Sequence, residues 1–150
     1  MEARLPPQAS GDSAQAGANE KRLFHGTRRE TVALINQKSF NRSYCGLNAT
    51  VYGMGTYFAC RSSYSADPTY SPPDAGRRQY MYLARVLVGA SVRGSSHMRE
   101  PPRRPEDPTR TYDSTCDGGQ EATSGASLYV VYHDAQAYPE YLITFTARPS

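Results

Sequence analysis

A ten-residue run at Gln79–Val88, QYMYLARVLV, most constrains what this chain can fold into. It is the longest strand-like segment in the sequence. The residues expected to share one face of this strand are Tyr80, Tyr82, Ala84 and Val86. Two later runs, Leu128–Tyr132 and Tyr141–Phe145, also predict strands, and the turn between them contains Asp134 and Pro139. We therefore expect an α+β fold dominated by strands.

Shorter elements are expected ahead of this run. Lys21–Thr27 predicts a short strand that carries a glycine near its end. Glu30–Asn36 has the apolar spacing of a short helix, with Thr27 as a candidate N-cap and Glu30 completing a capping box. Residues 39–55 are rich in Asn and Gly and predict a loop.

The middle of the chain alternates short elements with long connections. Thr56–Ala59 predicts a short buried strand, and Ser62–Ala66 predicts one or two helical turns that Pro68 stops. Residues 91–126 form a long connection rich in Pro, Gly and Arg. A connection of this length in a compact domain is usually functional or disordered.

Length and composition fit one domain preceded by a flexible N-terminal segment. The chain has 150 residues, 38% of them apolar, and a mean hydropathy of −0.67. Residues 1–20 are rich in Ala, Gly, Ser, Gln and Pro and are expected to be a flexible leader. The 12 tyrosines suit a half-hydrated ligand cleft and ordinary strand faces equally well.

Charge and cysteine content argue against several classes of protein. The net charge is +3 and the basic residues stand in short pairs, so direct nucleic-acid binding lacks support. The three cysteines form no CxxC pair, which argues against a zinc site. Their odd and small number argues against a disulfide framework and fits a reducing compartment. The sequence has no apolar run near the roughly 20 residues that span a bilayer, and no secretion signal at its start.

The familiar phosphate and protease motifs do not occur. Gly53-x-Gly55 lacks the third glycine of a dinucleotide-binding fingerprint. The informative feature is instead an ordered set of residues that could build a ligand site. They are His25, Gly26, Tyr57, Ser65 and Tyr70, followed by the two late strands. Taken singly, each has an ordinary structural explanation, as a buried hydrogen-bonding histidine or a core tyrosine.

Together these segments resemble the catalytic domain of the poly(ADP-ribose) polymerase superfamily, the diphtheria-toxin-like ADP-ribosyltransferases. The likeness is greatest to the mono-ADP-ribosyltransferase branch whose larger members also carry macrodomains. The resembling segments are residues 23–27, 40–53, 55–59, 70–73, 112–114 and 128–145. The resemblance implies a mixed and antiparallel two-sheet fold with few short helices. It makes residues 21–150 the catalytic domain, without the helix and strand that family domains carry ahead of His-Gly.

The resemblance also implies how the site would hold NAD⁺ as a co-substrate, without a metal. The His25 side chain would bind a hydroxyl of the adenosine ribose, and the Gly26 backbone would pair with the nicotinamide carboxamide. The Ser65 hydroxyl would add a bond to that carboxamide. Tyr57 would lie under the nicotinamide ring and Tyr70 would stack on its other face.

The third position of the family's catalytic triad determines the product. Chain-building members have a glutamate where this sequence has Leu128, and Glu140 falls in a later turn rather than at that position. An apolar side chain can neither accept a proton nor orient a hydroxyl. The resemblance therefore implies mono-ADP-ribosylation with catalytic positions His25, Tyr57 and Leu128.

Two substitutions depart from the family pattern. Met54 stands where the family has a lysine between two glycines, and Ser39 stands where it usually has a glycine before Phe40. If position 39 has a positive φ angle, serine adds strain there. These departures motivate an alternative, a catalytically inactive NAD-pocket or interaction module.

The expected partner is a protein acceptor, with the chain itself as one candidate. The expected location is the nucleus, the cytoplasm or both. Neither a membrane nor direct nucleic-acid binding is expected.

Overall fold

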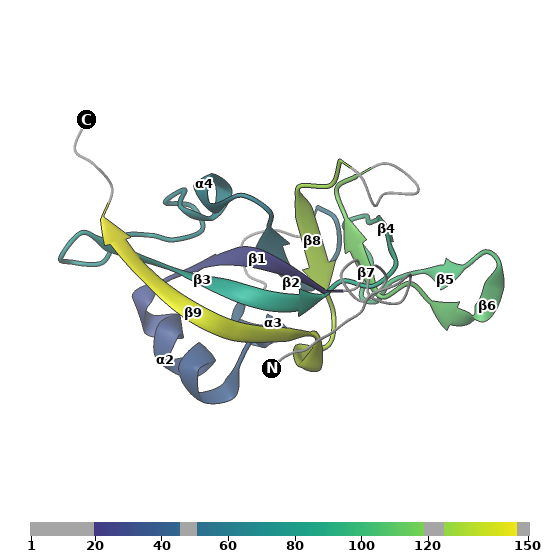
Figure 1. The fold of residues 1–150 in the computed structure, drawn as a ribbon, viewed down its shortest axis with the longest axis horizontal. Helices are drawn as coiled ribbons and strands as arrows, with labels where there is room; N and C mark the ends of the chain where they lie inside the picture. Colours follow the sequence, from purple (N-terminus) through teal and green to yellow (C-terminus); the bar gives the residue numbers. More distant parts are fainter. Residues whose placement is uncertain (1–19, 46–50, 119–124, 147–150) are drawn as a thin grey trace, which may run out of the picture.

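The computed structural model describes residues 20–45, 51–118 and 125–146, which form a seven-stranded sheet, short helices and a two-stranded hairpin (Figure 1). The strands are β1 (Glu20–Thr27), β2 (Thr56–Ala59), β3 (Arg78–Leu87), β4 (Ser91–Arg93), β5 (Arg103–Arg104), β6 (Asp107–Thr111), β7 (Ser114–Cys116), β8 (Leu128–Val131) and β9 (Ala137–Thr146). The helices are α2 (Arg29–Lys38), α3 (Arg42–Cys45), α4 (Ser62–Ser65) and the 3₁₀ helix η1 (Asp134–Gln136). The predicted strand-dominated α+β fold is confirmed.

The large sheet has the order β4-β7-β8-β2-β1-β3-β9 and consists of two halves. Its neighbours are antiparallel except for β4 and β7, which are parallel. The long strands β1, β3 and β9 lie side by side in one half (Figure 1). They join the other half where Phe24 of β1 stands opposite Ala59 of β2, and we call this β1–β2 junction the seam.

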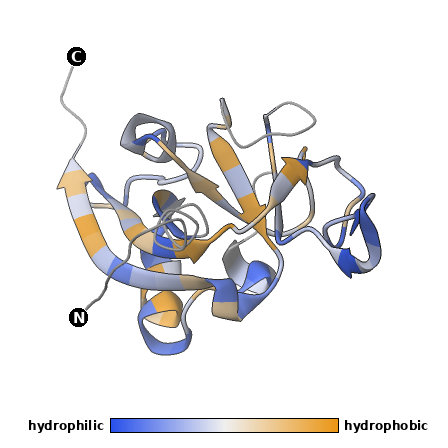
Figure 2. Cartoon of the chain, turned by 45° about the vertical axis from the view of Figure 1, so that its right-hand side comes forward, coloured by the Kyte–Doolittle hydropathy of each residue, from blue (hydrophilic) through white to orange (hydrophobic). Residues whose placement is uncertain are grey.

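The core lies between the sheet and α2. The hydroxyl of Tyr82 in β3 donates to the carbonyl of Val32 at 3.2 Å, which ties the helix to the sheet. Figure 2 shows hydrophobic residues along the central strands and hydrophilic ones on the β5–β6 hairpin. The buried core residues of this cluster include Leu23, Ile35, Phe40, Phe58, Tyr82, Ala84, Val86, Val88, Tyr129 and Val131.

The strand predicted at Gln79–Val88 is confirmed as β3, and both of its faces are covered at one end. Tyr82 is buried and Tyr80 is half-buried on the α2 side. On the other side, the Gln79 amide donates to the carbonyls of Ala66 and Ser71, each at 2.9 Å. The segment from α4 to Ser71 therefore packs over this end of the strand.

The start of α2 differs from the prediction. The N-cap is Arg28, with no side-chain hydrogen bond to the helix, so the predicted capping box at Thr27 and Glu30 is wrong. Thr27 is the last residue of β1 and stands opposite Tyr80 of β3. Because Thr27 is paired in the sheet, it does not serve as the helix cap that local sequence rules predict.

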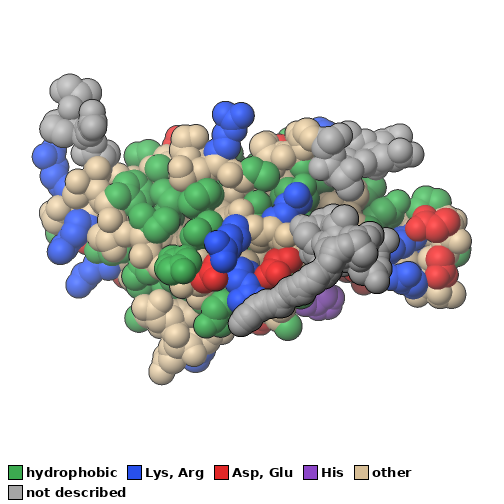
Figure 3. All heavy atoms as spheres, in the orientation of Figure 1, with side chains coloured by type: hydrophobic (Ala, Val, Ile, Leu, Met, Phe, Trp, Pro, Cys, Tyr) green, Lys and Arg blue, Asp and Glu red, His purple; other side chains and the backbone are tan. Residues whose placement is uncertain are grey.

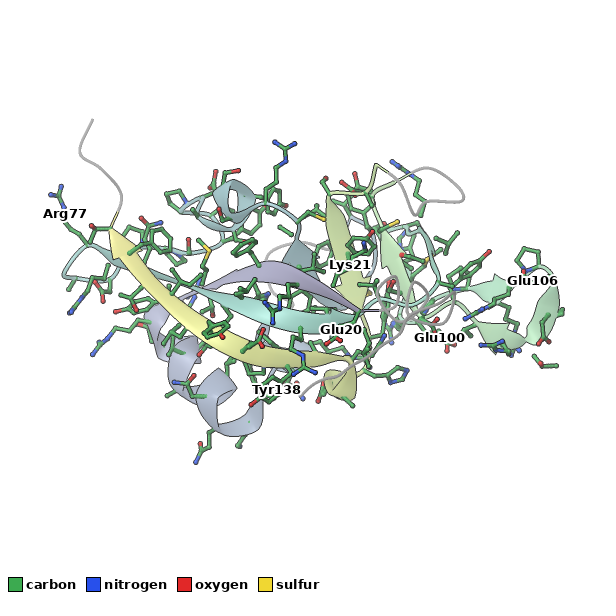
Figure 4. The ribbon with its side chains drawn as sticks, viewed as in Figure 1. Glu20, Lys21, Arg77, Glu100, Glu106 and Tyr138 are labelled. Atoms are coloured by element: carbon green, nitrogen blue, oxygen red, sulfur yellow. The ribbon has the colours of Figure 1, made fainter. Side chains whose placement is uncertain are left out.

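The two predicted loops contain regular structure. The 39–55 segment includes α3, and its residues 46–50 lie outside the described part of the chain. The 91–126 connection contains β4 to β7, and its residues 119–124 are also outside the description. Strands β5 and β6 form an arm that projects from the body, with Glu106 at its tip (Figure 4).

Strand β9 is an outer strand of the sheet and exposes large apolar side chains. They are Tyr138, Tyr141 and Leu142. Figure 3 shows hydrophobic side chains on the face where β9 lies, next to charged ones. Two of the ion pairs join Arg22 to Glu140 at 3.3 Å and Arg85 to Glu20 at 2.7 Å.

The expected leader falls almost wholly outside the described residues, which begin at Glu20 in β1. None of the helices in the described ranges is long and apolar enough to cross a membrane.

Ser39 at the end of α2 has the unfavourable backbone conformation that its sequence position suggested. Its φ is 65° and its ψ is −166°, a region that only glycine adopts readily. Its backbone N–H caps the helix by donating to the Ile35 carbonyl at 2.8 Å. Its hydroxyl gains only a 3.4 Å contact with the Ala137 carbonyl.

We expect Ser39→Gly to raise the free energy of unfolding by about 1 kcal/mol, because relief of strain exceeds the added entropy of an unfolded glycine. Urea unfolding curves would measure the change. Ser39→Ala is the matched control, since it removes the hydroxyl and keeps Cβ, and it should gain nothing. Equal stabilities for the Gly and Ala variants would contradict a strained φ.

Candidate active site

The His25 imidazole bridges the seam. Its Nδ1 lies 2.7 Å from the Tyr57 carbonyl oxygen, and because a carbonyl only accepts, Nδ1 carries the proton. Phe40 and Phe58 flank the ring at centroid distances of 5.2 and 5.3 Å. Burial lowers the pKa of His25 to about 4, although the bond to Tyr57 opposes this shift. The ring is therefore neutral near pH 7, and its Nε2 is a hydrogen-bond acceptor.

Gly26 allows the close approach of α4 to β1. A side chain at this position would collide with the Ser65 carbonyl oxygen and lie 3.1 Å from the Tyr70 Cβ. Gly26 is half-buried and pairs with Met81 of β3. The structure therefore brings three of the predicted ligand-binding residues, Gly26, Ser65 and Tyr70, into one place.

A stacked tyrosine pair forms one wall of this region. The rings of Tyr64 and Tyr70 lie 4.6 Å apart at 20°, and the Tyr64 hydroxyl donates to the Tyr70 hydroxyl at 2.8 Å. Burial, followed by the bond to Tyr70, raises the pKa of Tyr64 well above its usual value. The role of Tyr64 was not predicted from the sequence, where the turn at Pro68 was the signal that the chain returns to α4.

Buried polar groups hold Ser65 in place. Ser65 is buried, and its carbonyl accepts a hydrogen bond from the Ser71 hydroxyl at 2.8 Å. The Gln79 amide fixes Ser71 from β3. Sequence reasoning missed both residues, because their partners lie six and eight positions away across a turn.

The Tyr57 hydroxyl is fully engaged by the loop that precedes it. It donates to the Gly53 carbonyl at 2.9 Å and accepts from the Tyr52 backbone N–H at 2.8 Å. Burial is the largest influence on this hydroxyl and raises the pKa of Tyr57 to about 12. Tyr57 can therefore supply a ring face at neutral pH, and its hydroxyl stays protonated.

Strand register places Tyr57 and the His25 side chain on opposite faces of the sheet. Phe24 stands opposite Ala59, so with period-two alternation Gly26 and Tyr57 share a face. This is the α4 face, as the neighbours of Gly26 show. His25 contacts Phe58 on the other face and reaches the seam at the Tyr57 carbonyl.

Leu128 occupies the first position of β8, opposite Ala59 of β2. It is 8% exposed, and its backbone N–H donates to Asp117 Oδ1 at 3.0 Å. Glu140 lies on β9, four strands away from β8 in the sheet order, and forms an ion pair with Arg22. Glu140 does not stand at the Leu128 position, but the prediction that it lies in a turn is wrong, because it is part of strand β9.

The remaining expectations concern Met54 and metals. Met54 is 41% exposed, and its backbone N–H donates to the Met98 carbonyl at 2.7 Å. Among the described residues, no group of three or more His, Cys, Asp or Glu side chains is placed to hold a metal ion.

The poly(ADP-ribose) polymerase catalytic domain matches the chain over residues 8–147. The chain belongs to this family. The match confirms the resemblance drawn from the sequence.

Several relatives are named as protein mono-ADP-ribosyltransferases. Human PARP14 is 49% identical over 128 residues, which cover 85% of this chain and 7% of PARP14. Mouse PARP10 is 41% identical over 132 residues, which cover 88% of this chain and 13% of that protein. Human PARP11 is 35% identical over 144 residues, which cover 85% of this chain and 41% of that protein. The chain thus spans only a minor part of each of these relatives.

We expect stability to fall between pH 7 and pH 5 because His25 is buried and neutral. Its folded pKa of about 4 lies below the ordinary 6.5, so the unfolded chain binds the proton first as the pH falls. The contribution of neutral His25 to the free energy of unfolding is fully present above about pH 6.5 and is lost as the pH falls towards 4. At pH 5 the loss is about 2 kcal/mol. Urea unfolding at the two pH values would measure it.

His25→Gln is the informative variant, because its amide can donate to Tyr57 but does not titrate. Between pH 7 and pH 5 this variant should lose about 2 kcal/mol less stability than the unmodified chain does. His97→Gln, at an exposed position, is the control and should keep the full loss. A pH dependence that survives His25→Gln would show that His25 is not buried as a neutral group.

Proposed function

We propose that this chain transfers a single ADP-ribose unit from NAD⁺ to a protein acceptor and releases nicotinamide. The observation that carries the proposal is the combination of the Gly26, Ser65 and Tyr70 cluster with a leucine at the start of β8. The Gly26, Ser65 and Tyr70 cluster would hold the nicotinamide ring with its carboxamide. Leu128 lacks the carboxylate that is needed to extend an ADP-ribose chain. The names of the relatives support the same activity.

The residues have the chemistry to hold NAD⁺ as a substrate. The Gly26 backbone and the Ser65 hydroxyl would bond the carboxamide in both directions. Tyr64 supports one face of Tyr70, so the nicotinamide ring would stack on the other face. His25 Nε2, an acceptor in the neutral ring, would receive a hydrogen bond from a ribose hydroxyl.

The reaction breaks the bond between the nicotinamide nitrogen and the ribose carbon. The bonding electrons leave with the ring, whose positive charge is thereby neutralised, and an oxocarbenium-like carbon remains. A carboxylate of the acceptor protein then forms the new carbon–oxygen bond, and no proton needs to move. Neither His25 nor Tyr57 has to ionise, which agrees with the directions of their pKa shifts.

Leu128 supports the single-unit product. To add a second unit, a base must polarise a hydroxyl of the first one. Leu128 has no group for this, and the Tyr57 hydroxyl is already committed to the Gly53 carbonyl. No observation favours the inactive alternative, since the named relatives are transferases.

The acceptor and the location belong to the same proposal. The relatives' names support a protein acceptor, and the chain itself is one candidate. The sparse cysteines support action in the nucleus or cytoplasm, where thiols stay reduced.

Incubation with NAD⁺ labelled in the adenine ring should label the chain or an added acidic protein. Gly26→Ala should lower labelling by at least about tenfold, because the new methyl group displaces α4 from the nicotinamide position. Gly76→Ala is the matched control, since its neighbours lie at ordinary contact distance, and it should stay within about twofold. A folded unmodified chain that never incorporates label would refute the activity.

Leu128→Glu should still give single units. The new carboxylate would stand next to Asp117, which already accepts the backbone N–H of residue 128, so like charges would oppose its ionisation. We expect a stability loss of about 1–3 kcal/mol. Leu128→Gln, of similar shape and neutral, separates charge from size. Long polymers on a gel from Leu128→Glu would show that residue 128 alone sets product length.

A further inference from the structure

The Asp117 side chain fixes the start of β8. Its carboxylate accepts three hydrogen bonds: from the Ser127 N–H at 2.8 Å, the Ser127 hydroxyl at 2.6 Å and the Leu128 N–H at 3.0 Å. The Asp117 N–H also donates to the Leu128 carbonyl at 3.3 Å. Leu128 is therefore held from both its N–H and its carbonyl by one residue.

Arg93 holds the other side of the same turn. Its guanidinium donates to the carbonyls of Asp117 at 2.8 Å and Gly118 at 2.9 Å. The same guanidinium lies 5.4 Å from the centre of the Tyr52 ring. The Tyr52 N–H in turn donates to the Tyr57 hydroxyl. Contacts thus run without a break from Tyr57 to the turn that carries Asp117.

The Asp117 carboxylate is a structural anion and not a proton carrier. Partial burial alone would raise the pKa of Asp117, but the hydrogen bonds from Ser127 and Leu128 outweigh it and lower the pKa. The group stays ionised at neutral pH, and three donors already occupy it. Any influence on the reaction must act through the position of Leu128.

We propose that Asp117 is a positioning residue that sets Leu128 beside the reacting ribose carbon and so directs the ribosyl group to the protein acceptor instead of water. The inference rests on the proposed transferase activity. The apolar Leu128 side chain would exclude water from that side. If β8 shifts, water attacks the ribose carbon, nicotinamide leaves as before, and one proton passes to solvent.

The test compares Asp117→Ala with Asp117→Asn in the full chain. Alanine removes all three acceptor bonds. Asparagine keeps an oxygen for both backbone N–H groups and can donate to the Ser127 hydroxyl, so it should rescue the variant. The readout is the fraction of consumed NAD⁺ recovered as protein-bound ADP-ribose. We expect about a tenfold fall for alanine and at most about a twofold change for asparagine.

Affinity for a carbocyclic NAD⁺ analogue, whose glycosidic bond does not break, separates positioning from general damage. Asp117→Ala should keep this affinity within about twofold, because the ligand groups on β1 and α4 are untouched. A purely structural role would instead lower affinity, hydrolysis and transfer together. The recovered fraction does not depend on how much of the protein is folded, so partial unfolding cannot imitate the expected result.

Two further variants complete the design. Asp107→Ala is the control, because it removes a carboxylate on the β5–β6 arm that also accepts from a backbone N–H and a hydroxyl, those of Thr109 at 3.2 and 2.6 Å. This variant should leave unchanged the fraction of consumed NAD⁺ that is recovered as protein-bound ADP-ribose. Ser127→Ala removes one of the three bonds and should give a smaller fall, which keeps the proposal testable if Asp117→Ala does not fold.

The outcomes are distinguishable. An unchanged fraction in a folded, active Asp117→Ala chain would overturn the positioning role and leave the transferase activity standing. An unmodified chain that consumes no NAD⁺ would overturn the activity, and the positioning role with it.

Discussion

The hydrogen bond from His25 Nδ1 to the Tyr57 carbonyl is the contact on which the site depends. The two halves of the large sheet are registered across β1 and β2 by a single residue pair, Phe24 opposite Ala59. The imidazole adds a polar link at this junction, and Phe40 and Phe58 pack around it. Because the bond needs a protonated Nδ1, it fixes the tautomer and leaves Nε2 as an acceptor. A structural requirement of the seam thus gives His25 the acceptor that the proposed contact with a ribose hydroxyl needs.

The seam also explains how polar chemistry is divided between the two faces of the sheet. On the His25 face the surroundings are aromatic and dry, which keeps the ring neutral. On the other face, α4 approaches Gly26 closely, and the stacked Tyr64 and Tyr70 rings lie next to it. His25 and Gly26 lie near the end of β1, so the NAD⁺ of the proposed reaction would reach groups of both faces there.

The sequence predicted what depends on neighbours along the chain. The Gln79–Val88 run predicted β3 from its own pattern, and Pro68 correctly ended α4. It failed where distant residues decide: Thr27 pairs with Tyr80 in the sheet and caps no helix. The roles of Tyr64 and Asp117 were missed for the same reason, since each acts on a residue that a turn or loop brings back. Ser39 was the exception, because its family position already indicated a positive φ.

In the proposed reaction, the leucine at the start of β8 means that the acceptor protein, and not this chain, must supply the negative charge. Cleavage of NAD⁺ turns the cationic ring into neutral nicotinamide and leaves positive charge on the ribose carbon. A carboxylate at position 128 would stabilise a hydroxyl nucleophile, but it would have to be desolvated beside Asp117, which already carries a negative charge. With Leu128 that cost is absent, and the compensating anion must arrive with the acceptor. An acidic acceptor side chain would then provide both the nucleophile and the charge. The attached unit would offer only neutral hydroxyls for a second addition, and these need a base that Leu128 cannot supply.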